Sequence, residues 1–287
     1  MIEGSRVGAI KFWDWVRRKD ARGSASIERP KQADNSSGAL VGQTAIVTGA
    51  SGNIGSTIAR AMASGGANVV VHYHKNRRAA EALAGEIVAA GGVALPMQAD
   101  IRSMSEVQTL TDSVLDRFGQ IDILVNNTGV VKDKLLIMMS DADWGDVLDV
   151  NLSGTFNCCK CVVPHMKARK YGRIVNIGSI TGMVPQKMRA NYGASKRAMF
   201  GLTKCLAREL ASFNITVNLV APQVVKGGLS RHASAHELAA LAQYTPVGGL
   251  AENTDVAHAT AFLVGGGSRF ITGTALNLTG GLITWQL

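Results

Sequence analysis

The chain has 287 residues, of which 46% are hydrophobic and 18% are charged, and its formal net charge at pH 7 is +9. This length predicts a globular protein with a sizeable core, built as one large α/β domain or two small ones. No apolar run approaches the roughly 18 residues of a membrane helix, so we expect no membrane span. The positive charge indicates anionic partners. A phosphorylated cofactor or substrate meets that expectation, whereas no zinc, RNA-binding or basic-zipper motif supports a nucleic-acid partner.

Residues 1–40 are polar and are predicted to form an N-terminal extension that is partly disordered, followed by a catalytic domain at 41–287. Within the extension, residues 12–18 could form a short amphipathic helix. They lack the apolar core of a secretory signal, and the acidic residues argue against a transit peptide. The four cysteines are not spaced like a disulfide framework, which fits a reducing compartment. We therefore expect a cytoplasmic protein.

Short apolar runs alternate with longer amphipathic stretches from residue 44 onward. The apolar runs predict buried strands at 44–48, 68–73, 93–98, 121–126, 173–177, 216–220 and 275–278. The stretches between them predict helices at 56–64, 78–90, 105–118, 144–167, 192–211 and 254–264. This alternation predicts a single Rossmann-type, doubly wound parallel sheet of about seven strands with helices on both faces. In such sheets, ligands bind at the carboxyl ends of the strands.

A glycine-rich segment, Gly-Ala-Ser-Gly-Asn-Ile-Gly, follows the first predicted strand directly and leads into the first predicted helix. A pyrophosphate can lie against the positive end of a helix only where the side chains are small. A glycine pattern alone also occurs in ordinary turns, but the position after the first strand favours a cofactor. The predicted cofactor-binding residues here are Gly49, Ser51, Gly52, Asn53, Ile54 and Gly55.

The end of the second predicted strand is basic where an NAD-selective enzyme tends to carry an acid. Tyr73, His74 and Lys75 stand at this point and are followed by two arginines. An acid would accept from the ribose hydroxyls of NAD, whereas the 2′-phosphate of NADP prefers cations. The basic residues could also be the solvated start of a helix, but the absence of an acid at this point is an independent reason to favour NADP. We predict NADP(H) as the cofactor, bound in part by these three residues.

Tyr192 and Lys196 are four residues apart in a predicted helix and therefore project from one face. A phenol with a pKa of about 10 is a poor acid or base at neutral pH, but a fixed cation nearby favours the phenolate. The pair alone is a weak signal, because most such pairs are a half-buried aromatic beside a solvated charge. Ser179 after an apolar run and Asn151 upstream make the set more specific.

These residues together resemble the classical short-chain dehydrogenase/reductase family from about Leu40 to the C-terminus. The sequences of several segments, including Asn-Tyr-Gly-Ala-Ser-Lys at 191–196, are most similar to those of the 3-oxoacyl-(acyl-carrier-protein) reductases. The resemblance implies that Tyr192 protonates the carbonyl oxygen as hydride arrives from the nicotinamide. It also implies that Lys196 lowers the phenol pKa and binds the nicotinamide ribose, and that Ser179 holds the carbonyl oxygen. The remaining member of the implied catalytic set is Asn151, which anchors a water.

The resemblance implies further cofactor contacts after later strands. Asp100 and Ile101 would bind adenine, and Asn126 would support the loop beside the cofactor. The full set of additional implied contacts is Asp100, Ile101, Asn126, Thr128, Gly129, Tyr192, Lys196, Pro222 and Val225. Family resemblance also implies a homotetramer, or a homodimer. No metal is expected, because the reaction requires none.

Four departures from the family pattern affect these expectations. Asn53 stands where the middle glycine of the loop belongs, Thr128 replaces an alanine, and Gln223 replaces a glycine. Carrier-protein reductases tend to have arginines near two positions that are Met138 and Phe213 in this chain. These replacements remove positive charge from the expected docking surface. A carrier-protein substrate is therefore in question. A substrate lid is expected between about residues 226 and 244.

The leading hypothesis is an NADPH-dependent reductase of a ketone, such as a 3-oxoacyl thioester or a polyketide-like carbonyl. An alternative is an alcohol or polyol dehydrogenase of the same family that works in the oxidative direction. A third hypothesis, from another class, is a catalytically silent NADP-binding or assembly protein, which would keep its role after Tyr192→Phe.

Overall fold

The computed structural model describes residues 40–225, 227 and 234–284. The predicted extension at 1–40 lies outside the described residues except for Leu40. Seven parallel strands form one sheet in the order β3-β2-β1-β4-β5-β6-β7. The strands are β1 (Thr44–Val47), β2 (Asn68–Tyr73), β3 (Val93–Gln98), β4 (Ile123–Asn126), β5 (Gly172–Ile177), β6 (Ile215–Pro222) and β7 (Ala275–Leu278). The predicted doubly wound parallel sheet is confirmed.

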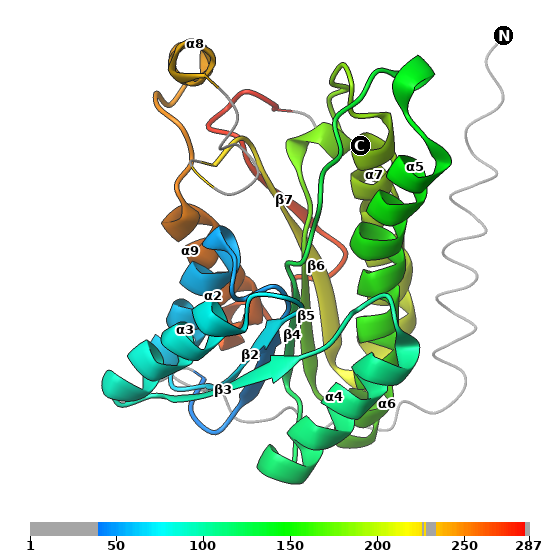
Figure 1. Ribbon diagram of the computed structural model, residues 1–287. Coiled ribbons are helices and arrows are strands. Elements are labelled where there is room, and N and C mark those ends of the chain that lie inside the picture. The colour runs from blue at the N-terminus through cyan, green and yellow to red at the C-terminus, as the bar shows by residue number, and fades with distance from the viewer. Residues whose placement is uncertain (1–39, 226, 228–233, 285–287) are drawn as a thin grey trace, which may run out of the picture. The chain divides into compact units, whose positions relative to one another are not determined.

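Helices cover both faces of this sheet (Figure 1). One face is covered by α2 (Asn53–Ser64), α3 (Arg77–Ala89) and α9 (Asn253–Val264). The other is covered by α4 (Met104–Phe118), α5 (Asp141–Leu148), α6 (Gly154–Arg169) and α7 (Ala190–Leu210). A further helix, α8 (Ala235–Tyr244), stands beyond one end of the sheet, within the stretch predicted as a lid. No helix in the described ranges is long and apolar enough to cross a membrane.

The central strands are apolar on both faces because each face packs against helices. In β4, Ile123 and Val125 pack into the core beneath α2, α3 and α9, whereas Leu124 packs into the core beneath α4 and α6. The order of strands reverses between β1 and β4, which are neighbours in the sheet. The crevice at their carboxyl ends is therefore where a ligand is expected.

Two predicted helices begin three residues earlier in the structure. The helix expected at 56–64 begins at Asn53, so the last part of the glycine segment is already helical. The helix expected at 144–167 runs from Asp141 to Arg169 and contains a π-helical segment, Asp149–Ser153. A capping box between Ser140 and Asp143 sets its start. Such π segments occur often at functional sites, and this one contains Asn151.

Candidate active site

The glycine segment forms a tight turn between β1 and α2. Gly49 has φ +62°, a left-handed conformation that favours glycine, and its carbonyl accepts from Gly52 N at 3.0 Å. Gly52 is the N-cap of α2 and provides no side-chain cap, and the first turn of α2 has no acidic residue. The N-terminal end of α2 is therefore left available to an anion.

Position 55 has no room for a side chain, because neighbouring protein atoms fill the space. A Cβ at this position would lie 2.6 Å from Asn127 Nδ2 and would also overlap the Gly49 carbonyl oxygen. The Asn127 amide donates to the carbonyl oxygens of Thr48 at 2.9 Å and Gly49 at 3.2 Å. Asn127 thus ties the loop after β4 to the glycine turn. The sequence alone assigned no role to this residue.

Asn126, which the resemblance assigns to the support of that loop, makes its side-chain hydrogen bonds in the core. It is the last residue of β4, and its side chain is buried in the sheet, where it donates to Asn176 Oδ1 at 2.9 Å and to Cys159 Sγ at 3.4 Å. Successive side chains of a strand point to opposite sides, so the neighbouring Asn127 reaches the loop instead. Burial raises the pKa of the Cys159 thiol to about 12, consistent with a packing role for this cysteine.

His72, in β2, holds the glycine turn from the other side. Its Nδ1 lies 3.0 Å from Gly49 N, and its Nε2 lies 3.0 Å from the Ala99 carbonyl oxygen. Burial lowers the pKa of His72 to about 4, so the ring is neutral near pH 7. Gly49 N–H must donate, so Nδ1 accepts and the Nε2 proton is donated to Ala99. A polar residue within an apolar strand was the only sequence signal for this role.

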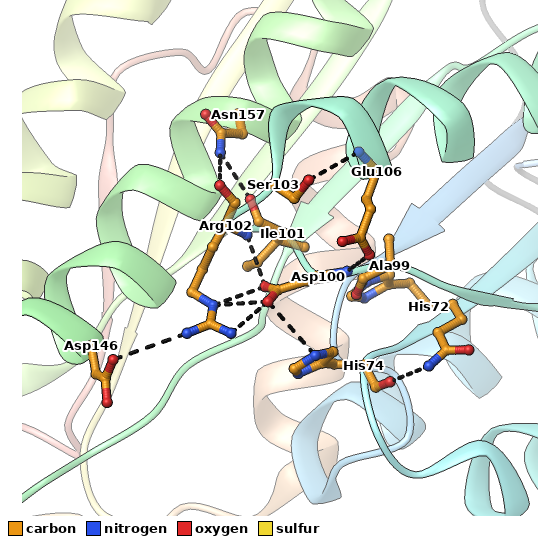
Figure 2. Close-up of polar contacts among 11 residues, drawn as sticks. His72, His74, Ala99, Asp100, Ile101, Arg102, Ser103, Glu106, Asp146 and Asn157 are labelled. Atoms are coloured by element: carbon orange, nitrogen blue, oxygen red, sulfur yellow. Dashed lines mark hydrogen bonds and ion pairs between the residues drawn. The ribbon is translucent and has the colours of Figure 1, made fainter.

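Asp100 lies just beyond β3 and is held in a polar cluster (Figure 2). Arg102 Nε donates to both Asp100 oxygens at 3.0 and 2.9 Å, and His74 Nε2 lies 3.7 Å away. The hydrogen bond from Arg102 lowers the pKa of Asp100 to about 2. Arg102 also reaches Asp146 of α5 at 4.0 Å.

The backbone beside Asp100 is fixed as well. Asp100 N donates to Glu106 Oε2 at 2.7 Å, and Asn157 Nδ2 of α6 donates to the carbonyl oxygens of Ile101 at 2.9 Å and Arg102 at 3.1 Å (Figure 2). The residues predicted to meet adenine, Asp100 and Ile101, are thus held in a fixed conformation at the edge of the crevice.

The basic residues after β2 are exposed. His74 and Lys75 are exposed, whereas Tyr73 is buried and its ring lies 5.9 Å from the Arg77 guanidinium. His74 and Asp100 are neighbours across the ends of β2 and β3, so an imidazole and a carboxylate meet at this point.

Tyr192 and Ser179 come together at the carboxyl end of β5. Tyr192 is 7% exposed and Ser179 is 9% exposed. Burial raises the pKa of Tyr192, while a hydrogen bond with Ser179 acts in the opposite direction. The lowering of this pKa by Lys196 stays a prediction.

Lys196 lies close to Tyr192 on α7, as the four-residue spacing predicts. Its Nζ is 5.7 Å from the centre of the Tyr192 ring and donates to the Ile177 carbonyl oxygen at 2.8 Å. Burial lowers the pKa of Lys196 to about 8. A buried amine with one carbonyl acceptor retains donor capacity for a further oxygen-bearing group.

Asn151 joins this group through the π segment. Its side chain exchanges two hydrogen bonds with the Val130 backbone, at 2.8 and 3.0 Å, and donates to Ser195 Oγ at 3.0 Å. Ser195 Oγ in turn donates to the Tyr192 carbonyl oxygen at 2.8 Å. A Cβ on Gly129 would lie 3.6 Å from both Asn151 Oδ1 and Lys196 Nζ. The structure therefore brings all four predicted catalytic residues to one place, and Ser195 is an added member that the sequence analysis missed.

Pro222 ends β6, and Val225 follows it as a buried residue that forms an isolated bridge with Ala251. Between them, Gln223 donates through Nε2 to Thr245 Oγ1 at 2.9 Å. Gln223 thus connects the end of β6 to the residue after α8. Of the predicted lid at about 226–244, only residue 227 and residues 234–244 are described.

Comparisons with known proteins identify the family. Residues 43–238 match the family model for short chain dehydrogenases. The chain belongs to the short-chain dehydrogenase family. It is 41% identical over 246 residues to a 3-oxoacyl-(acyl-carrier-protein) reductase of Synechocystis, with 85% of this chain and 98% of that protein covered. The corresponding enzyme of Escherichia coli is 36% identical, with 84% and 97% covered.

A solved structure is also similar to this short-chain dehydrogenase. It is a gluconate 5-dehydrogenase from Burkholderia cenocepacia in complex with NADP and tartrate, with a TM-score of 0.81, 33% identity and coverage of 85% of this chain and 96% of that chain. The comparisons confirm that this short-chain dehydrogenase is most like the 3-oxoacyl-(acyl-carrier-protein) reductases, and it is an oxidoreductase that acts on CH–OH and C=O groups.

Two features of the glycine turn suit a nicotinamide cofactor, which the family supports. A Cβ on Gly52 would lie 3.2 Å from the Gly49 carbonyl oxygen, so small residues keep the cradle before α2 open. The side-chain oxygen of Thr128, beside Gly49, is buried with no hydrogen-bond partner among the described residues. An unpaired oxygen of this kind is unfavourable unless a polar group is supplied to it.

Proposed function

We propose that this short-chain dehydrogenase reduces a ketone with NADPH, with a 3-oxoacyl thioester or a polyketide-like carbonyl as substrate and Tyr192 as the general acid. The observation that carries the proposal is that Tyr192 lies next to Ser179 and has the buried Lys196 Nζ 5.7 Å from the centre of its ring. Two hydroxyl donors at one point can hold a carbonyl oxygen and stabilise the oxyanion that develops there. A bound nicotinamide would supply the hydride.

The residues have separate roles in this proposal. Ser179 holds the carbonyl oxygen while the Tyr192 hydroxyl gives it a proton. A protonated Lys196 next to Tyr192 favours the phenolate that is left. Asn151 fixes the start of α7 through Ser195 and so keeps Tyr192 in position. Burial of the group excludes water, which strengthens each of these interactions.

Cofactor binding is proposed for the residues around the crevice. The start of α2 would hold the pyrophosphate, and His74 and Lys75 would contact the 2′-phosphate that distinguishes NADP from NAD. Asp100 and Ile101 would meet adenine. Supporting contacts would come from Gly49, Ser51, Gly52, Asn53, Ile54, Gly55, Tyr73, Thr128, Gly129, Pro222 and Val225, with Asn126 acting from beneath.

NADPH oxidation in the presence of acetoacetyl-CoA, compared with NADH, tests this proposal. We expect a preference for NADPH and a loss of about 10²- to 10⁴-fold in kcat for Tyr192→Phe. Tyr171→Phe is a control, because Tyr171 is partly buried and its hydroxyl donates to Gln43, away from the proposed catalytic residues. A Tyr192→Phe enzyme that is as active as the control would reject the assigned acid.

A second candidate is a polyol or alcohol dehydrogenase that works in the oxidative direction. The similarity to a gluconate 5-dehydrogenase favours it. The positions expected to dock a carrier protein also favour this second candidate, because neither carries an arginine. Met138 is apolar and 68% exposed, and the Phe213 ring lies 4.3 Å from Lys167 Nζ. Reduction of NADP⁺ with gluconate in place of a thioester separates the two candidates.

We also propose assembly as a homotetramer. Large apolar side chains remain exposed on the outer faces of α5 and α6, where Trp144 and Phe156 are 42% and 46% exposed. Light scattering combined with size-exclusion chromatography measures the number of subunits, and a monomer at micromolar concentration would contradict the proposal.

A further inference from the structure

We propose that Arg189 recognises a carboxylate on the substrate, so that the preferred ketone is an acid and its neutral ester is a poorer ligand. This inference rests on the proposed function of a ketone reductase at the same site, and among the proposed substrates it favours a carbonyl compound with a free carboxylate over a 3-oxoacyl thioester. Arg189 is the N-cap residue of α7, three positions before Tyr192. It does not belong to any motif that the sequence analysis singled out.

A chain of hydrogen bonds connects Arg189 to Ser179. Ser179 Oγ donates to Thr181 Oγ1 at 3.3 Å, and Thr181 Oγ1 donates to Gln186 Oε1 at 3.2 Å. The same Gln186 oxygen accepts from Arg189 NH1 at 2.6 Å. The guanidinium is also one of the charges that act on the Tyr192 phenol. Arg189 therefore lies within electrostatic range of the position where a carbonyl oxygen would be held.

The guanidinium has donors that remain available. Its Nε donates to both oxygens of Asp133, at 3.1 and 3.0 Å, and its NH1 donates to Gln186. Within residues 40–225, 227 and 234–284, NH2 has no hydrogen-bond acceptor. The Arg189 side chain is 30% exposed, so a ligand entering from solvent can reach it. A planar guanidinium with a free edge suits a carboxylate, which can accept two parallel N–H bonds.

Asp133 is the counter-ion that a substrate carboxylate would join or displace. The two lysines on either side of Asp133 form ion pairs with other carboxylates: Lys132 with Asp146 at 2.6 Å and Lys134 with Asp143 at 2.7 Å. Asp133 is itself 35% exposed, so exchange of one carboxylate for another does not require a buried charge to be left unpaired.

The backbone next to this pair is fixed by a bond between two loops. Met188, directly before Arg189, has φ +69°, which is unusual for a residue with a side chain, and its carbonyl oxygen accepts from Lys134 N at 2.8 Å. The loop after β4 and the loop after β5 are thereby joined next to Asp133 and Arg189. A strained, cross-linked backbone at this place is typical of a binding element that is set in advance.

Calorimetric titration of the complex with NADP⁺ tests the inference without turnover, because the oxidised cofactor cannot reduce a ketone. The two ligands are acetoacetate and methyl acetoacetate, which share the ketone and differ in the negative charge. We expect acetoacetate to bind more tightly than its methyl ester. Arg189→Gln should lower the affinity for acetoacetate by about 10- to 100-fold and leave the affinity for the ester unchanged. Arg189→Lys should retain part of the preference, and Asp133→Asn should increase it. Arg117→Gln on the exposed face of α4 controls for the change in net charge.

Equal binding of acid and ester to the unmodified protein would overturn the inference, as would an equal loss of both in Arg189→Gln. NADPH oxidation with the ester reports on the proposed function separately. Reduction of the ester with no preference for the acid in calorimetry leaves the reductase standing and rejects the role of Arg189. An Arg189-dependent preference without oxidation of NADPH by either ketone supports the carboxylate site and rejects the reductase.

Discussion

The Nδ1 atom of His72 lies 3.0 Å from the backbone nitrogen of Gly49 and accepts its hydrogen. Gly49 has a left-handed conformation at the point where β1 turns into α2. The other ring nitrogen of His72 bonds the Ala99 carbonyl oxygen just after β3. One neutral imidazole therefore connects the ends of β1, β2 and β3, and the glycine turn depends on its protonation state.

Stability is expected to fall in mild acid because of His72. The pKa of its ring is lowered from 6.5 to about 4 by burial, so between these values the unfolded chain binds a proton that the folded chain does not. The free energy of unfolding then decreases as pH falls through this window, by up to about 3 kcal/mol. Urea denaturation at a series of pH values measures it. His72→Asn removes the titrating group and should show a smaller pH dependence, and parallel curves would contradict the assignment.

Asn127→Ala and Asn126→Ala are expected to have different consequences. Asn127 bonds the Thr48 and Gly49 carbonyl oxygens, so its loss should loosen the glycine turn and raise the Kd of NADPH by about tenfold. Asn126 bonds Asn176 in the core, so its loss should lower the free energy of unfolding by about 1–3 kcal/mol. Fluorescence titration with NADPH and urea denaturation separate the effects. Identical behaviour of the two variants would mean that the two side chains act as one unit.

Gly55→Ala should destabilise the protein and weaken cofactor binding. The added methyl would overlap the Gly49 carbonyl oxygen and Asn127 Nδ2, and we expect a loss of about 1–3 kcal/mol in the free energy of unfolding. Gly85→Ala is the control, because nothing lies within 4 Å of a Cβ at this exposed position of α3. It should stabilise by about 0.4–1 kcal/mol. A Gly55→Ala protein as stable as the control would show that the turn can shift.

Thr181→Val should reduce kcat by about tenfold with little change in the KM for NADPH. The hydroxyl of Thr181 accepts from Ser179 and donates to Gln186, so its removal leaves the Ser179 hydroxyl without its fixed acceptor. Thr181→Ser keeps the hydroxyl and should restore the rate. Steady-state kinetics of the two variants measure the effect, and a Val variant as fast as the Ser variant would remove Thr181 from the set of positioning residues.

The sequence by itself determined the features that have a local signature. Alternation of apolar runs with amphipathic stretches predicted a doubly wound sheet, because period and strand order follow from neighbouring residues. The glycines before α2 and the four-residue spacing of Tyr192 and Lys196 are also local, and the structure places these residues at one end of the sheet.

Only the tertiary structure decided which side chains meet across the crevice. Asn126 and Asn127 are adjacent in the sequence and alike in chemistry, but the pleat of β4 sends one into the core and the other to the glycine turn. The partners of His72 and Arg189 are set by strand register and by the path of loops that are distant in sequence. These contacts have no period and no fixed spacing, because the hydrogen bonds that define them form only after the sheet has brought the strand ends together.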